Sequence, residues 1–337
     1  MNIFPLIAVG TCNTSLKGEI LDVRYDQIFS KEGKEIILTK PSYKYTYEVL
    51  DKILNDSEDD NFELPADTSL GDLNYDKWKE KNPRKLILIH KLEKDESIKN
   101  VKDAYLKLYL LSLKWVKPNS INLDGIFSGL PNVAWTNHGP MDPDEIEEHR
   151  NELDYLFIRS LDKFPCLTDY IVPPEVRIAD ASRVRLGAYL SEGTTVMHEG
   201  FINFNAGTLG PAMVEGRISA GVLIGANSDL GGGCSTMGTL SGGNDIKISV
   251  GEDCLLGANS GLGIPLGNRC VVEAGLYITS GTKIEVTLSK DNVKEVKASE
   301  LAFKDDLLFI RNSLTGKVQC KPNPNKITLN KDLHSNN

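Results

Sequence analysis

Glu215 is the residue of this chain whose setting best suits acid–base or nucleophilic chemistry. It stands in the segment MVEGR, flanked by Val214 and Gly216. Partial burial of a carboxyl group raises its pKa toward the neutral range, in which it can accept a proton from a reacting amine or attack an activated carbonyl itself. The residue types leave both roles open. The plainer interpretation is an ordinary glutamate of a surface loop.

The elements that must position Glu215 are short and regular. Of the 29 glycines, 21 lie between Ile178 and Ile284, and the same stretch carries an aliphatic or threonine residue every six positions. These residues are Ile178, Val184, Leu190, Val196, Ile202, Thr208, Ile218, Ile224, Leu230, Thr236, Val250, Leu256, Leu262, Leu266, Val272, Ile278 and Ile284. A period of six fits neither a helix nor an ordinary amphipathic strand.

This period predicts a parallel β-helix in which each six-residue unit forms one side of a triangular coil. The aliphatic residue points inward, and a small residue follows four positions later, so Cys234, Cys254 and Cys270 are interpreted as interior side chains. Two spacings break the period. Ten residues separate Thr208 from Ile218, which predicts a four-residue insertion containing Glu215, and fourteen separate Thr236 from Val250, which predicts an outward loop. Loops that leave a rigid scaffold often carry binding sites.

Four regions follow from these patterns. Residues 1–125 are expected to form an α/β domain, with strands at 2–9, 20–29 and 84–92 and a helix at 101–116. A helical linker occupies 126–175, with a helix from Pro143 to Leu161 capped by Asp142. The β-helix spans 176–284, and strands and a polar tail fill 285–337.

Composition excludes several classes of protein. With 337 residues the chain can bury a sizeable core, and its formal net charge of −9 disfavours nucleic-acid binding. No apolar run has the length needed to cross a bilayer, so no membrane partner is expected. The six cysteines are scattered and form no CxxC pair, which favours a reducing cytoplasm.

The run from RIADASRVRLGAYLSEGTTVMHEG through GPAMVEGRISAG, together with LLGANSGLGIPLG, LLFIRNS and LNKDLH, resembles the long-form tetrahydrodipicolinate N-succinyltransferases. This family of hexapeptide-repeat acyltransferases has a left-handed parallel β-helix, and the resemblance is specific over roughly residues 175–335. It implies transfer of succinyl from succinyl-CoA to tetrahydrodipicolinate, in the diaminopimelate pathway of lysine biosynthesis. The family places its catalytic glutamate in MVEGR, at Glu215.

The resemblance also implies a set of acyl-CoA contacts. These are Arg217, Gly232, Ser235, Ala258, Glu273, Ala274, Gly281, Lys297, Ile310, Arg311, Asn312 and Ser313. Small residues let the pantetheine arm lie close to the coil, and the basic side chains can meet phosphates. Arg217 can instead pair with the succinyl carboxylate, and coil packing alone explains the glycines and Ala258.

His198 and Glu199, in VMHEG, complete the implied site. Several hexapeptide acyltransferases use a histidine as the base, so His198 is an alternative to Glu215. A zinc site of three histidines is disfavoured, because the coil contains only this one histidine. The resemblance implies that Glu199 from three chains binds Mg²⁺ near the axis of a homotrimer. The resemblance implies a second acidic residue at a position where this chain has Ser182.

Two competing hypotheses remain from the sequence. The first is another hexapeptide acyltransferase, which uses acetyl-CoA or acts on a sugar amine or serine. Donor preference, and whether His198 or Glu215 is indispensable, distinguish it. The second is a β-helix scaffold without catalytic activity, which the broken register and the MVEGR segment disfavour.

Overall fold

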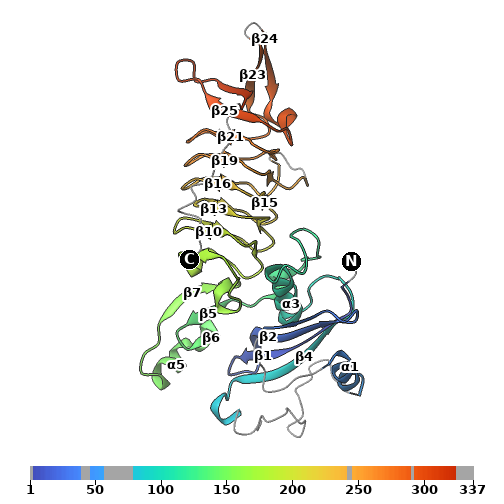
Figure 1. Cartoon of the computed structure of the whole chain (residues 1–337). Coiled ribbons are helices and arrows are strands. Elements are labelled where there is room, and N and C mark those ends of the chain that lie inside the picture. Colours follow the sequence, from blue (N-terminus) through green and yellow to red (C-terminus); the bar gives the residue numbers. More distant parts are fainter. Residues whose placement is uncertain (1–2, 39–45, 57–78, 241–244, 290–291, 324–337) are drawn as a thin grey trace. The chain divides into compact units, whose positions relative to one another are not determined.

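The computed structural model describes residues 3–38, 46–56, 79–240, 245–289 and 292–323 (Figure 1). The chain divides into two compact units, the first formed by 1–107 and 121–165 and the second by 108–120 and 166–337. The four-part division expected from the sequence stays a prediction. Across the described ranges, no helix has both the length and the apolar character needed to cross a membrane.

The first unit is built on an antiparallel sheet in the order β3-β2-β1-β4. Its strands are β1 (Leu6–Thr14), β2 (Ile20–Ser30), β3 (Glu35–Ile37) and β4 (Lys85–Leu92). The predicted strands are therefore confirmed, the first of them displaced toward the C-terminus. One face of the sheet buries Ile7, Val9, Ile87 and Ile89 against Leu50 of helix α1 (Tyr47–Asp56).

Helix α3 (Val101–Ser112) lies where the sequence predicts a helix but ends four residues early. Asn100 caps its first turn by accepting a hydrogen bond from the Asp103 N–H at 3.0 Å. The helix ends because Lys114 takes a left-handed φ of 62°, and the next N–H, that of Trp115, returns to the carbonyl of Leu110.

The predicted helix from Pro143 to Leu161 is wrong in its second half. A 3-10 turn η1 (Pro143–Glu145) leads into α5 (Ile146–Glu152), and Asp142 caps the start as expected, its side chain accepting the Asp144 N–H at 2.9 Å. Strand β7 (Ile158–Asp162) then pairs with β5 (Val133–Thr136), which also pairs with β6 (Gly139–Met141). Pairing with a distant strand overrides the local helical pattern.

The second unit is the expected parallel coil, and its rungs form three faces. Face I contains β8 (Arg177–Ile178), β10 (Thr194–Val196), β13 (Ala212–Val214), β16 (Ser228–Leu230), β19 (Leu255–Leu256) and β21 (Val271–Val272). Face II contains β11 (Phe201–Ile202), β14 (Arg217–Ile218), β17 (Ser235–Thr236), β20 (Gly261–Leu262) and β22 (Tyr277–Ile278). Face III contains β9 (Tyr189–Leu190), β12 (Gly207–Thr208), β15 (Leu223–Ile224) and β18 (Ser249–Val250). Figure 1 shows the face I rungs stacked in order.

The break between Thr208 and Ile218 differs from the expectation. Val214 is buried and ends β13, six residues after Thr208, so it is an inward position that the six-residue count did not include. The next inward residue, Ile218, follows after only four residues. The coil therefore has a shortened corner here rather than a four-residue insertion.

The outward loop after Thr236 agrees with the expectation at both of its described ends. Thr239 and Lys247 form an antiparallel bridge, and the Ile246 carbonyl accepts the Leu240 N–H at 2.8 Å. Residues 241–244 lie outside the described ranges.

Small side chains fill the interior of the coil, and the backbones of successive coils lie close together. The side chains of Cys234, Cys254 and Cys270 are buried, as expected. A Cβ atom on Gly225 would lie 2.5 Å from the Gly251 carbonyl of the next coil, so only glycine allows this spacing.

The coil ends in extended strands. Hairpin β23 (Lys283–Ser289) and β24 (Asn292–Lys297) is followed by β25 (Leu307–Arg311), which continues face I beside β21, and by β26 (Val318–Pro322). The strands expected after residue 284 are thus present.

Candidate functional site

The corner segments that lead from face I to face II stack into one edge of the coil, here called the I/II edge. It consists of residues 197–200, 215–216, 231–234, 257–260 and 273–276. Backbone hydrogen bonds join successive corners: Gly233 N–H to the Glu215 carbonyl at 3.1 Å, Asn259 N–H to the Gly232 carbonyl at 2.9 Å, and Gly275 N–H to the Ala258 carbonyl at 2.8 Å. Seven of the candidate site residues named from the sequence lie on this edge: His198, Glu199, Glu215, Gly232, Ala258, Glu273 and Ala274.

Glu215 directly follows the inward Val214, so it belongs to the coil rather than to a projecting loop. Its own N–H donates to the Leu230 carbonyl at 2.8 Å, which fixes its backbone. The side chain is half-buried, and within the described residues its carboxylate has no hydrogen bond or ion pair. A carboxylate held by a rigid backbone and left unpaired is available to an incoming group.

Two carboxylates converge above Gly232. The position of a Cβ atom on that glycine lies 3.4 Å from Oε2 of Glu199 and 3.5 Å from Oε2 of Glu215. Glu199 comes three residues after its inward residue Val196, whereas Glu215 comes one residue after Val214. The sequence therefore assigns them to different points of the corner, and only the folded chain brings them to one space.

Cys234 lies beneath this corner and is not a competing nucleophile. Burial, together with the negative charges of Asp229 and Glu215, raises the pKa of the thiol to about 12. At neutral pH the thiol is protonated and therefore unreactive. This agrees with its interpretation as an interior packing residue.

Arg217 and Ser235 stand side by side where face II begins. The Arg217 guanidinium donates to Oγ of Ser235 from Nε at 3.1 Å and from Nη2 at 2.6 Å. On the following strands of face II, the residues in register with Ser235 are Gly261 and then Tyr277. The ring of Tyr277 packs directly against Gly261. Tyr277 was missed from the sequence, although its place directly before the inward Ile278 matches that of Arg217 before Ile218.

The C-terminal contact residues reach the I/II edge through Glu273. Its Oε2 accepts the backbone N–H of Arg311 at 2.6 Å, so Ile310 and Arg311 of β25 adjoin this edge. Asn312 turns the chain by accepting the N–H groups of Leu314 and Thr315 with its side-chain oxygen, both at 3.0 Å. Ser313 lies in this exposed turn.

Gly281 and Lys297 are not brought to the I/II edge of the same chain. Gly281 lies in the corner that follows face II, where Ser280 and Thr282 accept backbone hydrogen bonds from Ser299 and Ala298. Lys297 ends β24 beside Lys283. These two residues are therefore neighbours on another part of the coil.

At the expected metal position, Glu199 provides one carboxylate per chain, and the carboxylate of Glu215 points into the same space. Glu199 is exposed and has no hydrogen bond or ion pair in the part of the chain that the structure describes. No group of three histidine, cysteine, aspartate or glutamate side chains suited to a metal occurs among those residues. Oxygen ligands suit Mg²⁺, but a single chain supplies too few of them, so the residues fit this ion only if several chains share it.

Ser182 lies in the 3-10 turn η3 (Ala181–Arg183). Oγ and the backbone N–H of Ser182 donate to Oδ1 of Asp180 at 2.7 and 2.9 Å. These hydrogen bonds lower the pKa of Asp180, and the charges of Arg183 and His198 lower it further. His198 itself is exposed.

Three family models match separate parts of the chain. They describe the N-terminal part of tetrahydrodipicolinate N-succinyltransferase, at residues 44–128, its middle part, at 130–165, and the hexapeptide repeat of succinyl-transferase, at 247–280.

Curated relatives and a solved structure are also named as tetrahydropyridine-carboxylate N-succinyltransferases. The chain is 61% identical over 252 residues, 73% of each protein, to the 2,3,4,5-tetrahydropyridine-2,6-dicarboxylate N-succinyltransferase of Pseudomonas aeruginosa. It is 55% identical over 262 residues, 76% of each protein, to the enzyme of that name from Vibrio cholerae. A crystal structure from Campylobacter jejuni, described as a 2,3,4,5-tetrahydropyridine-2-carboxylate N-succinyltransferase, matches 97% of this chain and 94% of its own with a TM-score of 0.75 and 31% identity. With the hexapeptide repeat, this likeness assigns the coil to the left-handed parallel β-helices.

Proposed function

The chain belongs to the family of the 2,3,4,5-tetrahydropyridine-2,6-dicarboxylate N-succinyltransferases, and from this premise we propose that the I/II edge around Glu215 is its acyl-transfer site. The reaction is transfer of a succinyl group from succinyl-CoA to tetrahydrodipicolinate, in the diaminopimelate branch of lysine biosynthesis. The observation that carries the assignment of the site is the half-buried, unpaired carboxylate of Glu215 above Gly232.

The chemistry requires one new bond and one broken bond at the thioester carbon. Water opens the cyclic imine, the freed amine nitrogen bonds to the succinyl carbonyl carbon, and the carbon–sulfur bond breaks to release CoA as its thiol. The products are N-succinyl-2-amino-6-oxopimelate and CoA. Glu215 either takes the proton of the attacking amine or attacks the thioester first and forms a mixed anhydride.

The neighbours of Glu215 suit an acyl-CoA lying along the edge. Gly232, Ala258 and Ala274 leave room for the pantetheine arm. Arg217, oriented by its hydrogen bonds to Ser235, offers a cation for the succinyl carboxylate or for a phosphate. Glu273 and Arg311, with Ile310, Asn312 and Ser313, extend this path beyond the last rungs of face I.

A homotrimer completes the site in this proposal. Gly281 and Lys297 lie away from the I/II edge of their own chain, so they contact the same acyl-CoA only if a second chain provides them. Glu199 from three chains would then share one Mg²⁺. Sedimentation should give a trimer, and Glu199→Gln should lower the Mg²⁺ content of that trimer; an active monomer contradicts the proposal.

The proposed cytoplasmic location is based on cysteines that form no disulfide bond. All six are free thiols, which agrees with a reducing compartment. Cell fractionation followed by immunodetection tests this location.

The deciding experiment measures CoA release by the purified protein. Succinyl-CoA and acetyl-CoA are each offered with and without tetrahydrodipicolinate. Sustained release that needs both succinyl-CoA and the imine supports the proposed reaction. A single equivalent of CoA released without the imine supports the anhydride route, whereas release with acetyl-CoA as the better donor contradicts the succinyl assignment.

A further inference from the structure

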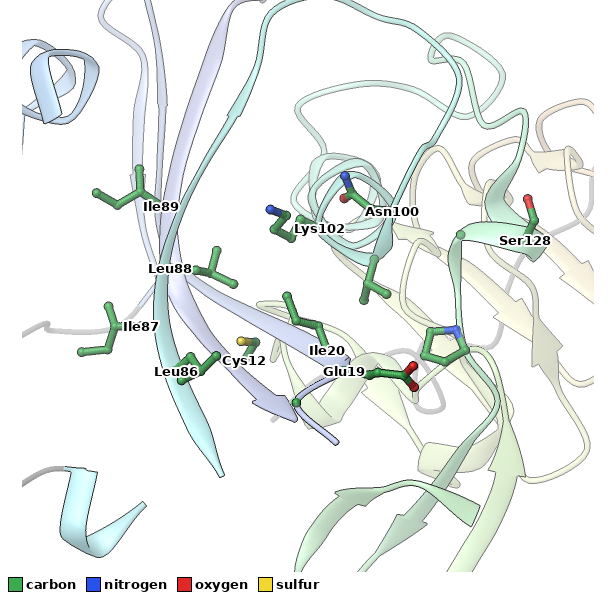
Figure 2. Close-up of a pocket in the computed structure, with 14 residues that line it drawn as sticks. Cys12, Glu19, Ile20, Leu86, Ile87, Leu88, Ile89, Asn100, Lys102 and Ser128 are labelled. Atoms are coloured by element: carbon green, nitrogen blue, oxygen red, sulfur yellow. The ribbon is translucent and has the colours of Figure 1, made fainter. Parts of the chain in front are cut away.

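Two features of the molecule lie outside the contacts assigned above: a cavity in the first unit and an exposed tyrosine on face II of the coil. The cavity has a volume of about 580 Å³ and lies between the sheet and the start of α3, with Leu88, Cys12 and Ile20 facing it (Figure 2). Its wall is largely apolar, and its lysine, Lys102, already has a partner within the protein. The tyrosine, Tyr277, is 47% exposed and is the feature that bears on the proposed reaction.

Tyr277 belongs to an outward column of face II. Arg217, Ser235, Gly261 and Tyr277 occupy the same position on four successive strands of this face, each in register with the next. Neighbouring strands of a sheet lie about 4.8 Å apart. The ring atoms of Tyr277 occupy the place at which a Cβ atom on Gly261 would stand. The side chain of Tyr277 therefore reaches back along the column, over the rung that adjoins Ser235.

Gly261 makes this position of the ring possible. The three atoms nearest to a Cβ on Gly261 all belong to the Tyr277 ring. Gly261 does not take a left-handed φ, so its backbone conformation does not require glycine. Any side chain at this position would displace the ring. The glycine is therefore explained by the tyrosine that it seats.

Arg217 approaches Ser235 from the other side. Its guanidinium donates to Oγ of Ser235 at 3.1 and 2.6 Å, and within the described residues it has no carboxylate partner. In the same part of the chain, the hydroxyl of Tyr277 makes no hydrogen bond. A cation and a neutral donor thus flank Ser235 along one exposed column. A carboxylate accepts hydrogen bonds from both kinds of donor.

We propose that Tyr277, together with Arg217, holds the distal carboxylate of the succinyl group, so that Tyr277 determines the preference for succinyl-CoA over donors that lack this carboxylate. This role rests on the proposed acyl transfer at Glu215. Two methylene groups separate the carboxylate from the thioester carbon, and one residue, Gly216, separates Glu215 from Arg217. A donor whose reacting carbon lies at Glu215 can therefore place its carboxylate above Ser235. There the Tyr277 hydroxyl donates to one carboxylate oxygen, and Arg217 balances the charge.

The test is isothermal titration of the full-length protein with two stable thioethers of CoA. S-(3-carboxypropyl)-CoA carries the distal carboxylate, S-butyl-CoA carries a methyl group in its place, and neither can transfer an acyl group. The wild type should bind the carboxylate form at least about tenfold more tightly. Tyr277→Phe removes only the hydroxyl and should reduce this preference by about tenfold or more, the loss that follows from one hydrogen bond to a charged group. Its affinity for S-butyl-CoA should not change.

The matched control is Tyr189→Phe. Tyr189 lies directly before the inward Leu190 on face III, the same position that Tyr277 has before Ile278 on face II. This variant should bind both thioethers as the wild type does.

Gly261→Ala tests the seating of the ring. Its methyl group takes the place of the ring, so the tyrosine must move and the preference for the carboxylate should fall as it does in Tyr277→Phe. In the double variant Gly261→Ala/Tyr277→Phe the preference should fall no further, because both changes remove the same hydrogen bond. Circular dichroism checks that each variant is folded.

The failures of this role and of the proposed function are distinguishable. An unchanged preference in Tyr277→Phe, or an equal loss of affinity for both thioethers, overturns the role of Tyr277 while leaving the acyl-CoA site in place. If the wild type binds neither thioether, the proposed acyl-CoA site is overturned as well.

Discussion

Glu199 and Glu215 each direct one carboxylate oxygen at the same point above Gly232, at 3.4 and 3.5 Å from the position of an absent Cβ atom. The shortened corner after Val214 produces this meeting, because it brings Glu215 into the corner immediately after the rung. Two acidic groups that face one space favour a cationic or proton-donating partner there. An attacking amine and a shared Mg²⁺ both have that character.

Replacing Glu215 by Gln should reduce turnover by at least about 100-fold, the scale of a missing acid–base group. The amide has the same shape, so the coil and the assembly should remain intact. CoA release and sedimentation are measured on the same sample. Glu252→Gln, an exposed glutamate of the coil, is the control and should keep full activity. A near-normal rate in Glu215→Gln removes this residue from the mechanism.

Replacing Gly232 by Ala should impair activity without loss of stability. Its new methyl group meets only the two carboxylate oxygens, at ordinary contact distance, so the fold tolerates it. The methyl occupies the space into which both carboxylates point, and kcat/KM should fall on the order of tenfold or more.

The matched control for this variant is Gly231→Ala. A Cβ atom there would lie 2.9 Å from the backbone N of Ala258 and from the Leu256 carbonyl, so this neighbour should lose thermal stability. Full activity in the folded Gly232→Ala protein contradicts a reacting role for the space above Gly232.

Replacing Lys107 by Met should destabilise the first unit by about 1.5–3 kcal/mol, because it removes the hydrogen bonds of a buried charged donor. The ammonium group is fully buried and donates to Oδ1 of Asp95 at 2.8 Å, to the Asn122 carbonyl at 2.7 Å and to the Glu96 carbonyl. Urea denaturation measures the free energy of unfolding. Lys99→Met removes an exposed pair with Glu96 and should cost less than about 1 kcal/mol. Equal effects of the two changes contradict the role of Lys107.

The buried pair of His90 and Asp103 should make stability depend on pH. Nε2 of His90 lies 2.9 Å from Oδ1 of Asp103, and burial lowers the pKa of His90 despite the opposing effect of Asp103. The folded state therefore keeps His90 neutral at a pH at which the unfolded state takes up a proton. The free energy of unfolding should fall as the pH drops below about 6.5, the ordinary pKa of histidine.

Urea denaturation of wild type and His90→Gln from about pH 7.5 to 5.5 tests this dependence. The variant should lose part of the slope, whereas His138→Gln, at an exposed position, should retain it. The pKa of Asp103 is also lowered, by hydrogen bonds from His90 and from the Lys99 N–H that outweigh its burial. Its contribution is lost only as the pH falls below about 3.9, outside this window. Identical slopes for wild type and His90→Gln would count against a neutral buried His90.

The six-residue period by itself determined the coil. One inward residue in every six predicts a coil with three faces. Glycine is required where the backbones of successive coils lie close together, as at Gly225 and Gly251. These are local constraints, and a single sequence displays them directly. The resemblance carried by MVEGR and its neighbours likewise pointed to Glu215 from the residues alone.

Tertiary structure alone decided where the reacting groups meet. The six-residue count placed Glu215 in an inserted loop, because Val214 as an inward residue and a shortened corner give the same spacing as an insertion. Strand β7 stands where a helix was predicted because pairing with β5 outweighs local pattern. The convergence of Glu199 and Glu215 depends on how successive corners of the coil stack, which no local periodicity encodes.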